Sequence, residues 1–137
     1  MFTKIRNRVE AGGGEGGFTL IELLVVIIII AILAAIAIPM YLSQRQKGWR
    51  ATVQSDLRNA AVAEESYFTD SHPSSYTTDM ATLESNAYGF HKSADVEISA
   101  PTGDVNGYCL QADNVNNSGD IWSLNSNTGE PQPHACP

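Results

Sequence analysis

The chain has 137 residues and is acidic, with 8 Lys and Arg residues against 15 Asp and Glu residues and a formal net charge of −7. Because nucleic-acid backbones are also negative, this balance argues against direct nucleic-acid binding. A basic start and a long apolar run fill the first 38 residues. The remainder, about 100 residues, is enough for one small domain and no second.

The chain begins with a basic and glycine-dense segment. Residues 1–17 contain three basic residues, followed by several glycines between residues 12 and 17. Glycine loses much backbone entropy on ordering, so we expect this segment to be flexible.

The apolar run over residues 18–38 organises the rest of the chain. It contains 21 residues, of which 19 are apolar. As a helix it would span about 31 Å, close to the thickness of a bilayer hydrocarbon core. Glu22 is the one ionisable residue in the run, and a charge near the membrane centre costs at least ~2.5 kcal/mol. The sequence therefore predicts a membrane-spanning helix whose Glu22 requires a partner.

Two simpler interpretations compete for the same run. A basic start before an apolar segment is typical of a secretory signal peptide, but this run is too long for one, and a plain signal has no reason to carry Glu22. An ordinary single-pass anchor explains the length but gives no role to Glu22 or to the Gly16-Gly17-Phe18 junction.

Residues 17–39 resemble the N-terminal signature of type IV pilins and pseudopilins. Gly17 precedes Phe18, Glu22 stands four residues after that Phe, a β-branched and Leu-rich helix follows, and Pro39 closes it. The resemblance implies that a prepilin peptidase cuts after Gly17 and methylates the new amine of Phe18. It also implies that Glu22 pairs with the amine of a neighbouring copy and so fixes the register of assembly.

The resemblance further implies how the chain is divided. Residues 1–17 would be a leader peptide, residues 18–38 a transmembrane and assembly helix, and residues 39–137 a continuation of the helix with a C-terminal β domain. The fold would be α+β and type IV pilin-like, with the long N-terminal helix packed on a small antiparallel sheet. Loss of the leader removes 3 basic and 2 acidic residues, so the mature chain would carry 5 basic and 13 acidic residues, a net charge of −8.

Beyond the apolar run, a second helical pattern follows Pro39. This proline lacks a backbone N–H and clashes with the preceding turn, so we expect it to kink the helix and not to end it. Apolar residues then recur at spacings of three and four, which predicts one helix over about residues 18–67. The predicted core face comprises Trp49, Val53, Leu57, Ala60, Ala61, Glu64 and Phe68, and the other faces carry Gln46, Arg50, Asp56 and Arg58.

The C-terminal part predicts a small antiparallel meander. Residues 69–76 have the composition of a loop, after which Thr78 or Asp79 can cap a short helix over residues 80–84. Three alternating segments follow at residues 95–100, 108–112 and 120–124, separated by turns at 101–104 and 114–119. The candidates for contact with the long helix are Ile98, Tyr108, Leu110 and Ile121, with Trp122 as a further candidate.

Cys109 and Cys136 are the only cysteines in the chain. An even pair in an exported domain with a small core indicates one structural disulfide. A redox pair or half of a metal site is the alternative, but the pair is far apart in sequence and lacks a Cys-x-x-Cys motif. The proline-rich tail, residues 129–137, is unsuited to a strand interior and would need the disulfide to hold it.

Other chemistry is weakly represented. His72, His91 and His134 could join Ser and Asp in a hydrolytic triad, but no motif frames them, so no enzymatic activity is predicted. Residues 114–119 resemble the first half of a calcium loop, yet Asn125 stands where the loop requires Glu. A solvated hairpin loop is favoured there, and no metal or other cofactor is predicted.

The resemblance implies a structural subunit of a type IV pilus or pilus-like filament. It would sit in the inner or cytoplasmic membrane through one helix, with its C-terminal domain outside, and then join a homo-oligomeric helical filament on the cell surface. Its partners would be further copies, the prepilin peptidase, the pilus assembly platform with its ATPase machinery, and the membrane. The alternatives are a pseudopilin of a type II secretion or DNA-uptake system and a monomeric membrane-anchored binding protein.

Overall fold

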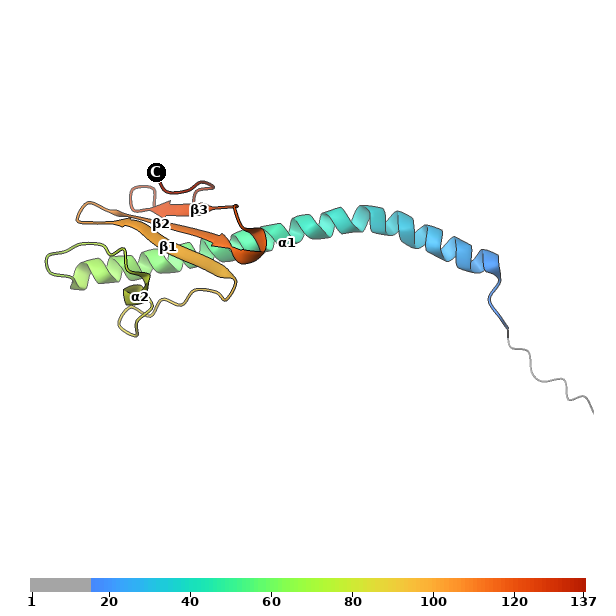
Figure 1. The fold of residues 1–137 in the computed structure, drawn as a ribbon, viewed down its shortest axis with the longest axis horizontal. Coiled ribbons are helices and arrows are strands. Elements are labelled where there is room, and N and C mark those ends of the chain that lie inside the picture. The colour runs from blue at the N-terminus through green and yellow to red at the C-terminus, as the bar shows by residue number, and fades with distance from the viewer. Residues whose placement is uncertain (1–15) are drawn as a thin grey trace, which may run out of the picture. The chain divides into compact units, whose positions relative to one another are not determined.

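The computed structural model describes residues 16–137, so most of the predicted leader lies outside the described residues. In chain order the elements are α1 (Leu20–Asp70), α2 (Met80–Leu83), β1 (Val96–Gly103), β2 (Tyr108–Asn114), the 3₁₀ turn η1 (Val115–Asn117) and β3 (Trp122–Asn125) (Figure 1). This order confirms the predicted α+β fold of a long helix with a small antiparallel sheet. The chain divides into two compact units, Met1–Pro39 and Met40–Pro137.

The N-terminal unit consists of the first part of α1. The helix continues through Pro39, so the proline does not end it, and the expected kink stays a prediction. Within residues 16–137 this helix contains the one segment long and apolar enough to cross a membrane. Every bulky apolar side chain from residue 18 to residue 42 is exposed, with fractions between 47% and 91%. The described residues of this unit therefore form no hydrophobic core of their own.

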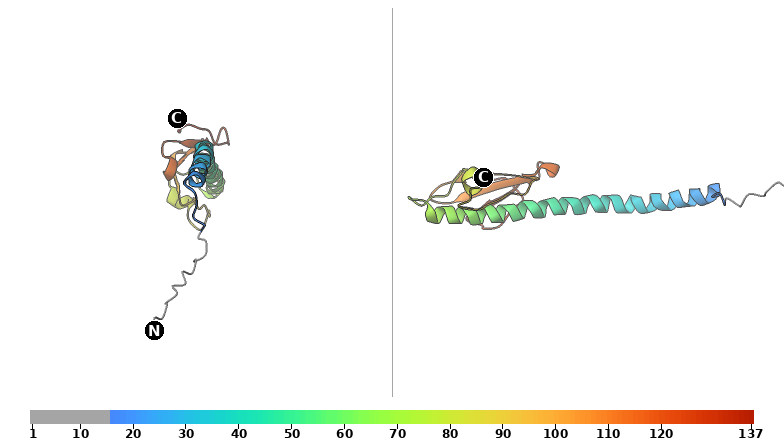
Figure 2. Two further views of the ribbon diagram at one scale, coloured as in Figure 1. Left: turned by 90° about the vertical axis from the view of Figure 1, so that its right-hand side faces the viewer. Right: turned by 90° about the horizontal axis from the view of Figure 1, so that it is seen from below.

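In the C-terminal unit, the second part of α1 buries one face against the sheet (Figures 1 and 2). The three strands lie along one side of this part of the helix in the order β1-β2-β3, and both pairings are antiparallel. The buried helix face comprises Val53, Asp56, Leu57, Ala60, Ala63 and Glu64. This confirms that the predicted core face is buried from Val53 to Glu64.

The two ends of the predicted helix face lie outside the core. Trp49 is half-buried beside Arg45, whose guanidinium carbon lies 4.8 Å from the indole centroid. Phe68 is half-buried and stacks on Tyr76, with 4.5 Å between ring centroids. The assignment of both aromatic residues to the core face was wrong, because each packs on a single neighbouring side chain at one end of that face and stays partly exposed.

Asp56 was predicted on a face of the helix other than the core face, and this was wrong. Only 4% of the residue is exposed. Its carboxylate accepts hydrogen bonds from the backbone N–H of Ser93 at 2.7 Å and from the Ser93 hydroxyl at 3.2 Å. Local donors of this kind reduce the cost of burying a carboxylate, so Asp56 fastens the segment before β1 to the helix.

The strand register determines which side chains reach the core. Leu110 is paired with Leu124, and Ala112 is paired with Trp122. Because side chains alternate between the two faces of a strand, Leu124 joins Tyr108 and Leu110 in the core while Ile121 does not. Ile98 and Trp122 are partly buried against the same cluster, as predicted. The choice of Ile121 as a helix contact was wrong by one residue of register.

The turn between β1 and β2 comes later than predicted. β1 continues through Pro101 to Gly103, with a register irregularity between Ser99 and Thr102. Proline is tolerated there because β1 is an edge strand and the irregular pairing leaves its missing N–H without consequence. Asp104 begins the turn instead, and its carboxylate accepts from the backbone N–H groups of Asn106 at 2.7 Å and Gly107 at 3.1 Å.

The C-terminal tail is held on β2 and β3. Cys109 and Cys136 form the predicted disulfide, which ties the tail to the second strand. Backbone hydrogen bonds between Ser123 and Gln132, of 2.9 and 2.7 Å, attach the tail to the edge of β3. The tail forms no longer strand, in agreement with its proline content.

Glu64 is a fully buried acid in the core of this unit. The residue is 0% exposed, and its Oε2 atom accepts a 3.0 Å hydrogen bond from the backbone N–H of Thr77. Its other oxygen has no hydrogen-bond partner among the described residues. Burial, reinforced by the charge of Glu65, raises the pKa of Glu64 to about 7 in spite of the Thr77 hydrogen bond. The neutral acid is therefore the form that the core accommodates best.

This buried acid predicts a stability that falls as the pH rises. The unfolded chain releases the proton near the ordinary pKa of 4.5, whereas the folded chain keeps it to about 7. The contribution of Glu64 to the free energy of unfolding is therefore complete below the pKa of the unfolded chain and is lost as the pH rises through the pKa of the folded chain. The free energy of unfolding should fall by roughly 2–3 kcal/mol between pH 5 and pH 8. Thermal unfolding of the detergent-solubilised chain followed by circular dichroism measures this difference.

The matched variants are Glu64→Gln and Glu65→Gln. Glu64→Gln keeps the shape without a titrating group, so we expect its stability to depend less on pH than that of the wild type. Glu65 is exposed and bonded to the Tyr76 hydroxyl, so Glu65→Gln should retain most of the wild-type slope. Equal slopes in wild type and Glu64→Gln would contradict the assignment.

Candidate assembly site

The start of α1 forms a reciprocal set of hydrogen bonds between Thr19 and Glu22. The backbone N–H of Glu22 donates to the Thr19 hydroxyl at 3.2 Å. In return, the Glu22 Oε2 atom accepts from the backbone N–H and from the hydroxyl of Thr19, both at 2.9 Å. This is a capping box, in which the residue before the helix and the third residue inside it satisfy each other's free N–H groups.

The capping box gives Glu22 a local partner that the sequence analysis did not identify. The signal was present, since Thr19-Leu20-Ile21-Glu22 is the Thr-x-x-Glu pattern that marks helix starts. It also explains why α1 begins at Leu20 and not at residue 18. Thr19 supplies neutral donors, however, so the negative charge of Glu22 still lacks a compensating cation.

The predicted cleavage junction lies immediately before the capping box. Gly16, Gly17 and Phe18 precede the helix and have no regular secondary structure, and Phe18 is 91% exposed. An ideal Cβ atom built on Gly16 or Gly17 would meet no other heavy atom within 4 Å. The peptide bond after Gly17 therefore lies outside regular secondary structure and is sterically open to a protease.

The predicted site residues do not form one cluster. Gly17, Phe18 and Glu22 lie together at the start of the helix, and Pro39 follows farther along α1. Cys109 and Cys136 join the C-terminal tail to β2. The N-terminal group has the features of an assembly site, whereas the disulfide stabilises the globular part.

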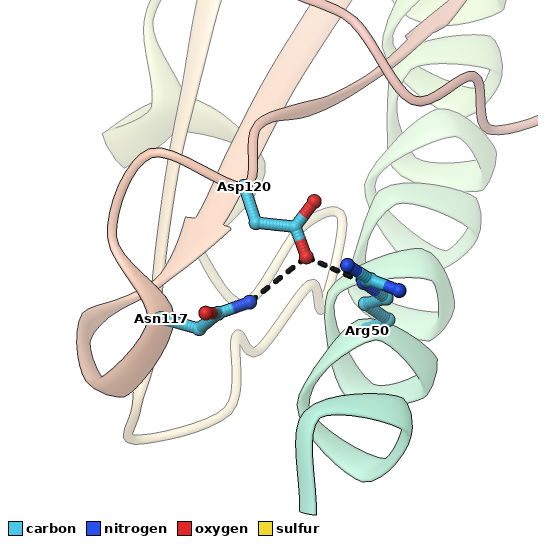
Figure 3. A network of polar contacts seen from close by, with 3 residues as sticks. All are labelled: Arg50, Asn117 and Asp120. Atoms are coloured by element: carbon cyan, nitrogen blue, oxygen red, sulfur yellow. Dashed lines mark hydrogen bonds and ion pairs between the residues drawn. The ribbon is translucent and has the colours of Figure 1, made fainter. Parts of the chain in front are cut away.

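The loop after β2 is held by an arginine. Asp120 accepts hydrogen bonds through the same Oδ2 atom from the Arg50 side chain of α1 and from the Asn117 side-chain amide, the latter at 2.8 Å (Figure 3). The Arg50 charge compensates this carboxylate and anchors the loop to the helix. Among residues 16–137, no three His, Cys, Asp or Glu side chains gather in an arrangement that could hold a metal ion.

One histidine approaches a serine, but the pair has the wrong geometry for hydrolysis. The Nδ1 atom of His134 lies 3.5 Å from the Ser123 hydroxyl and 2.7 Å from the backbone oxygen of Ala135. The short contact to a carbonyl requires a proton on Nδ1, so this nitrogen is not free to accept one from the serine.

Known proteins match this chain both in the short N-terminal segment and over most of its length. The prokaryotic N-terminal methylation motif matches residues 13–38. The type IV wide pilus major component PilA4 of Thermus thermophilus is 36% identical over 132 residues, which covers 88% of this chain and 96% of that protein. The type IV major pilin protein PilA of Myxococcus xanthus is 33% identical over 81 residues, or 57% of this chain and 37% of that protein.

The capping box predicts a specific effect of substitutions at Thr19. Thr19→Val removes the hydroxyl and preserves the shape, and loss of such a cap costs about 1 kcal/mol, or about fivefold in local opening. We expect amide hydrogen exchange at residues 20–23 to become about fivefold faster, as measured by NMR in detergent micelles. Thr19→Ser keeps the hydroxyl and serves as the control. Unchanged exchange in Thr19→Val would show that the cap does not stabilise the first turn.

Proposed function

This chain belongs to the type IV pilin family, and we propose that it is made as a membrane-anchored precursor, cut between Gly17 and Phe18, and polymerised through α1. It is a structural subunit of a pilus. Pilin subunits are in general not enzymes, and we propose no catalytic role for this one. The likeness to two major pilins favours a pilus over a pseudopilus of a secretion or DNA-uptake system.

The observation that carries the proposal is the uncovered apolar surface of α1. All the bulky apolar side chains between residues 18 and 42 are exposed in the single chain. Burial of each such side chain is worth roughly 1.5–3 kcal/mol, so the segment requires a cover. Lipid would cover it in the precursor, and the corresponding helices of other copies would cover it in the filament.

The new amine created by cleavage would complete the partners of Glu22. In the precursor the nitrogen of Phe18 is part of a peptide bond, and after cleavage it becomes an ammonium group. A buried carboxylate and a buried ammonium are each costly alone, whereas a close pair offsets much of the cost. An incoming copy whose Phe18 amine meets Glu22 of a neighbour would therefore be favoured at one axial position.

The remaining features support an extracytoplasmic globular part. The disulfide between Cys109 and Cys136 suits an oxidising compartment. We propose that the prepilin peptidase acts at the cytoplasmic membrane face and that the assembly platform with its ATPase extracts the processed subunit. Electron microscopy of a sheared surface fraction, probed for this chain, tests the function. The presence of only monomeric membrane protein would favour the anchored binding protein instead.

Processing predicts a defined N-terminus. We expect the protein in sheared filaments to begin at Phe18 and to carry a methylated amine, because the open Gly17-Phe18 junction precedes the capped helix. Intact mass and N-terminal peptide analysis measure both features. Assembled protein that retains Met1, or that begins near Ile38, would exclude this cleavage site.

If Glu22 acts only in assembly, its substitution should leave processing intact and impair filament formation. We expect Glu22→Ala to insert and to be cleaved after Gly17, yet to give at least tenfold fewer filaments, since an unpaired ammonium in an apolar core costs several kcal/mol. Glu22→Gln should also fail, because it keeps the shape and loses the charge. The measurement is the ratio of filament protein to processed membrane protein. A normal ratio in either variant would show that the charge does not set the register.

A further inference from the structure

The side chain of Arg45 lies between two aromatic rings on the part of α1 that follows the apolar run. Its guanidinium carbon is 5.9 Å from the centroid of Tyr41 and 4.8 Å from the centroid of Trp49. The three residues are spaced by four, so they share one side of the helix. Stacking of this kind orients the planar guanidinium and leaves its N–H groups free to bind an anion.

No acceptor is provided for this guanidinium within the described part of the chain. The ion pairs among residues 16–137 are those of Arg50 with Asp120 and of Lys92 with Glu97, and neither involves Arg45. Arg45 is exposed, and Tyr41 is 62% exposed. The stack is therefore an oriented cation at the surface, without an anion.

The position of the stack in the sequence indicates the source of the anion. Tyr41 stands three residues after Ile38 within α1, so a rise of 1.5 Å per residue carries it about 4.5 Å along the helix from the end of the apolar run. The headgroup layer of one leaflet is about 5–8 Å thick, and tyrosine, tryptophan and arginine are typical of this layer. Tyr41 thus reaches the level of lipid phosphates whenever residues 18–38 span a membrane.

The distribution of charge supports the same source. From residue 23 to residue 55 there are three basic residues and no acid, whereas residues 56–137 contain 12 acids and 2 basic residues. The segment around the stack attracts a negatively charged membrane surface, which the rest of the globular part would repel.

We propose that Tyr41, Arg45 and Trp49 form a binding site for the phosphate of an anionic phospholipid headgroup in the extracytoplasmic leaflet. Arg45 donates to the phosphate, and the two rings hold its guanidinium at that depth. This proposal rests on the membrane-anchored stage of the proposed function. The contact fixes the depth of the subunit in the membrane and must be released when the subunit enters the filament.

The test uses Trp49 as a reporter in the full chain reconstituted into phosphatidylcholine vesicles. Trp122→Phe provides the background, because the buried Nε1 of Trp122 has no hydrogen-bond partner in the described structure and its loss removes the second tryptophan. A small fraction of phosphatidylglycerol or phosphatidylcholine with a nitroxide next to the glycerol is then added. Quenching of Trp49 by the two lipids gives their relative binding constants at this site.

We expect the preference for phosphatidylglycerol to be about fivefold greater in the wild type than in Arg45→Gln, the value for one basic residue at an anionic surface. Arg58→Gln is the matched control, since Arg58 is an exposed arginine of the same helix and lies outside the stack, and it should retain the wild-type preference. Arg45→Lys keeps the charge without the planar guanidinium and should fall in between.

The other outcomes overturn the proposal in distinguishable ways. If wild type and Arg45→Gln prefer phosphatidylglycerol equally, Arg45 does not bind a headgroup. If the filament yield of Arg45→Gln also falls in that case, Arg45 instead contacts the acidic surface of a second copy. Equal preference in wild type and Arg45→Lys would exclude a role for the stack. Failure of the protein to float with the vesicles would overturn the membrane-anchored stage itself.

Discussion

The apolar surface of residues 18–42 is the constraint on which the rest of the molecule depends. In the single chain these side chains enter no core, since the bulky apolar ones are all exposed. A helix of this length and composition is stable in lipid because its backbone groups are satisfied within the helix. The same self-sufficiency lets identical helices replace lipid around one another. One segment can therefore serve as anchor and as filament core without refolding.

The C-terminal unit meets a different requirement, which is to hold a small domain together next to such a segment. Its hydrophobic core is modest, and specific polar contacts supplement it. Asp56 fastens the segment before β1 to the helix, and the Arg50–Asp120 pair does the same for the loop after β2 (Figure 3). The disulfide holds the tail. Each of these contacts connects α1 or β2 to a segment that lies outside the three strands.

The sequence predicted the elements of the fold well, and their side-chain partners less well. The 3.6-residue period located α1 and the core side chains from Val53 to Glu64, because burial of one helix face leaves a direct trace in the sequence. Register left no such trace, so Ile121 was predicted as a helix contact and Leu124 was not, although both residues are apolar. The burial of Asp56 could not be predicted from periodicity, because an acid counts as polar in the pattern whether or not Ser93 donates hydrogen bonds to it. The capping box, by contrast, does leave a trace in the sequence, the Thr-x-x-Glu pattern of Thr19 and Glu22.

The capping box bears on the register role that we propose for Glu22. A carboxylate has two oxygens, and Thr19 engages only Oε2, while Oε1 makes no hydrogen bond among residues 16–137. The proposed cleavage after Gly17 would leave both Thr19 donors in place, because Thr19 would become the second residue of the mature chain. Glu22 can therefore cap its own helix and accept an ammonium group from another copy at the same time. The cap holds the carboxylate in one orientation before the partner arrives, which lowers the entropic cost of pairing. The contacts that begin the helix would in this way also orient Glu22 for the proposed pairing in the filament.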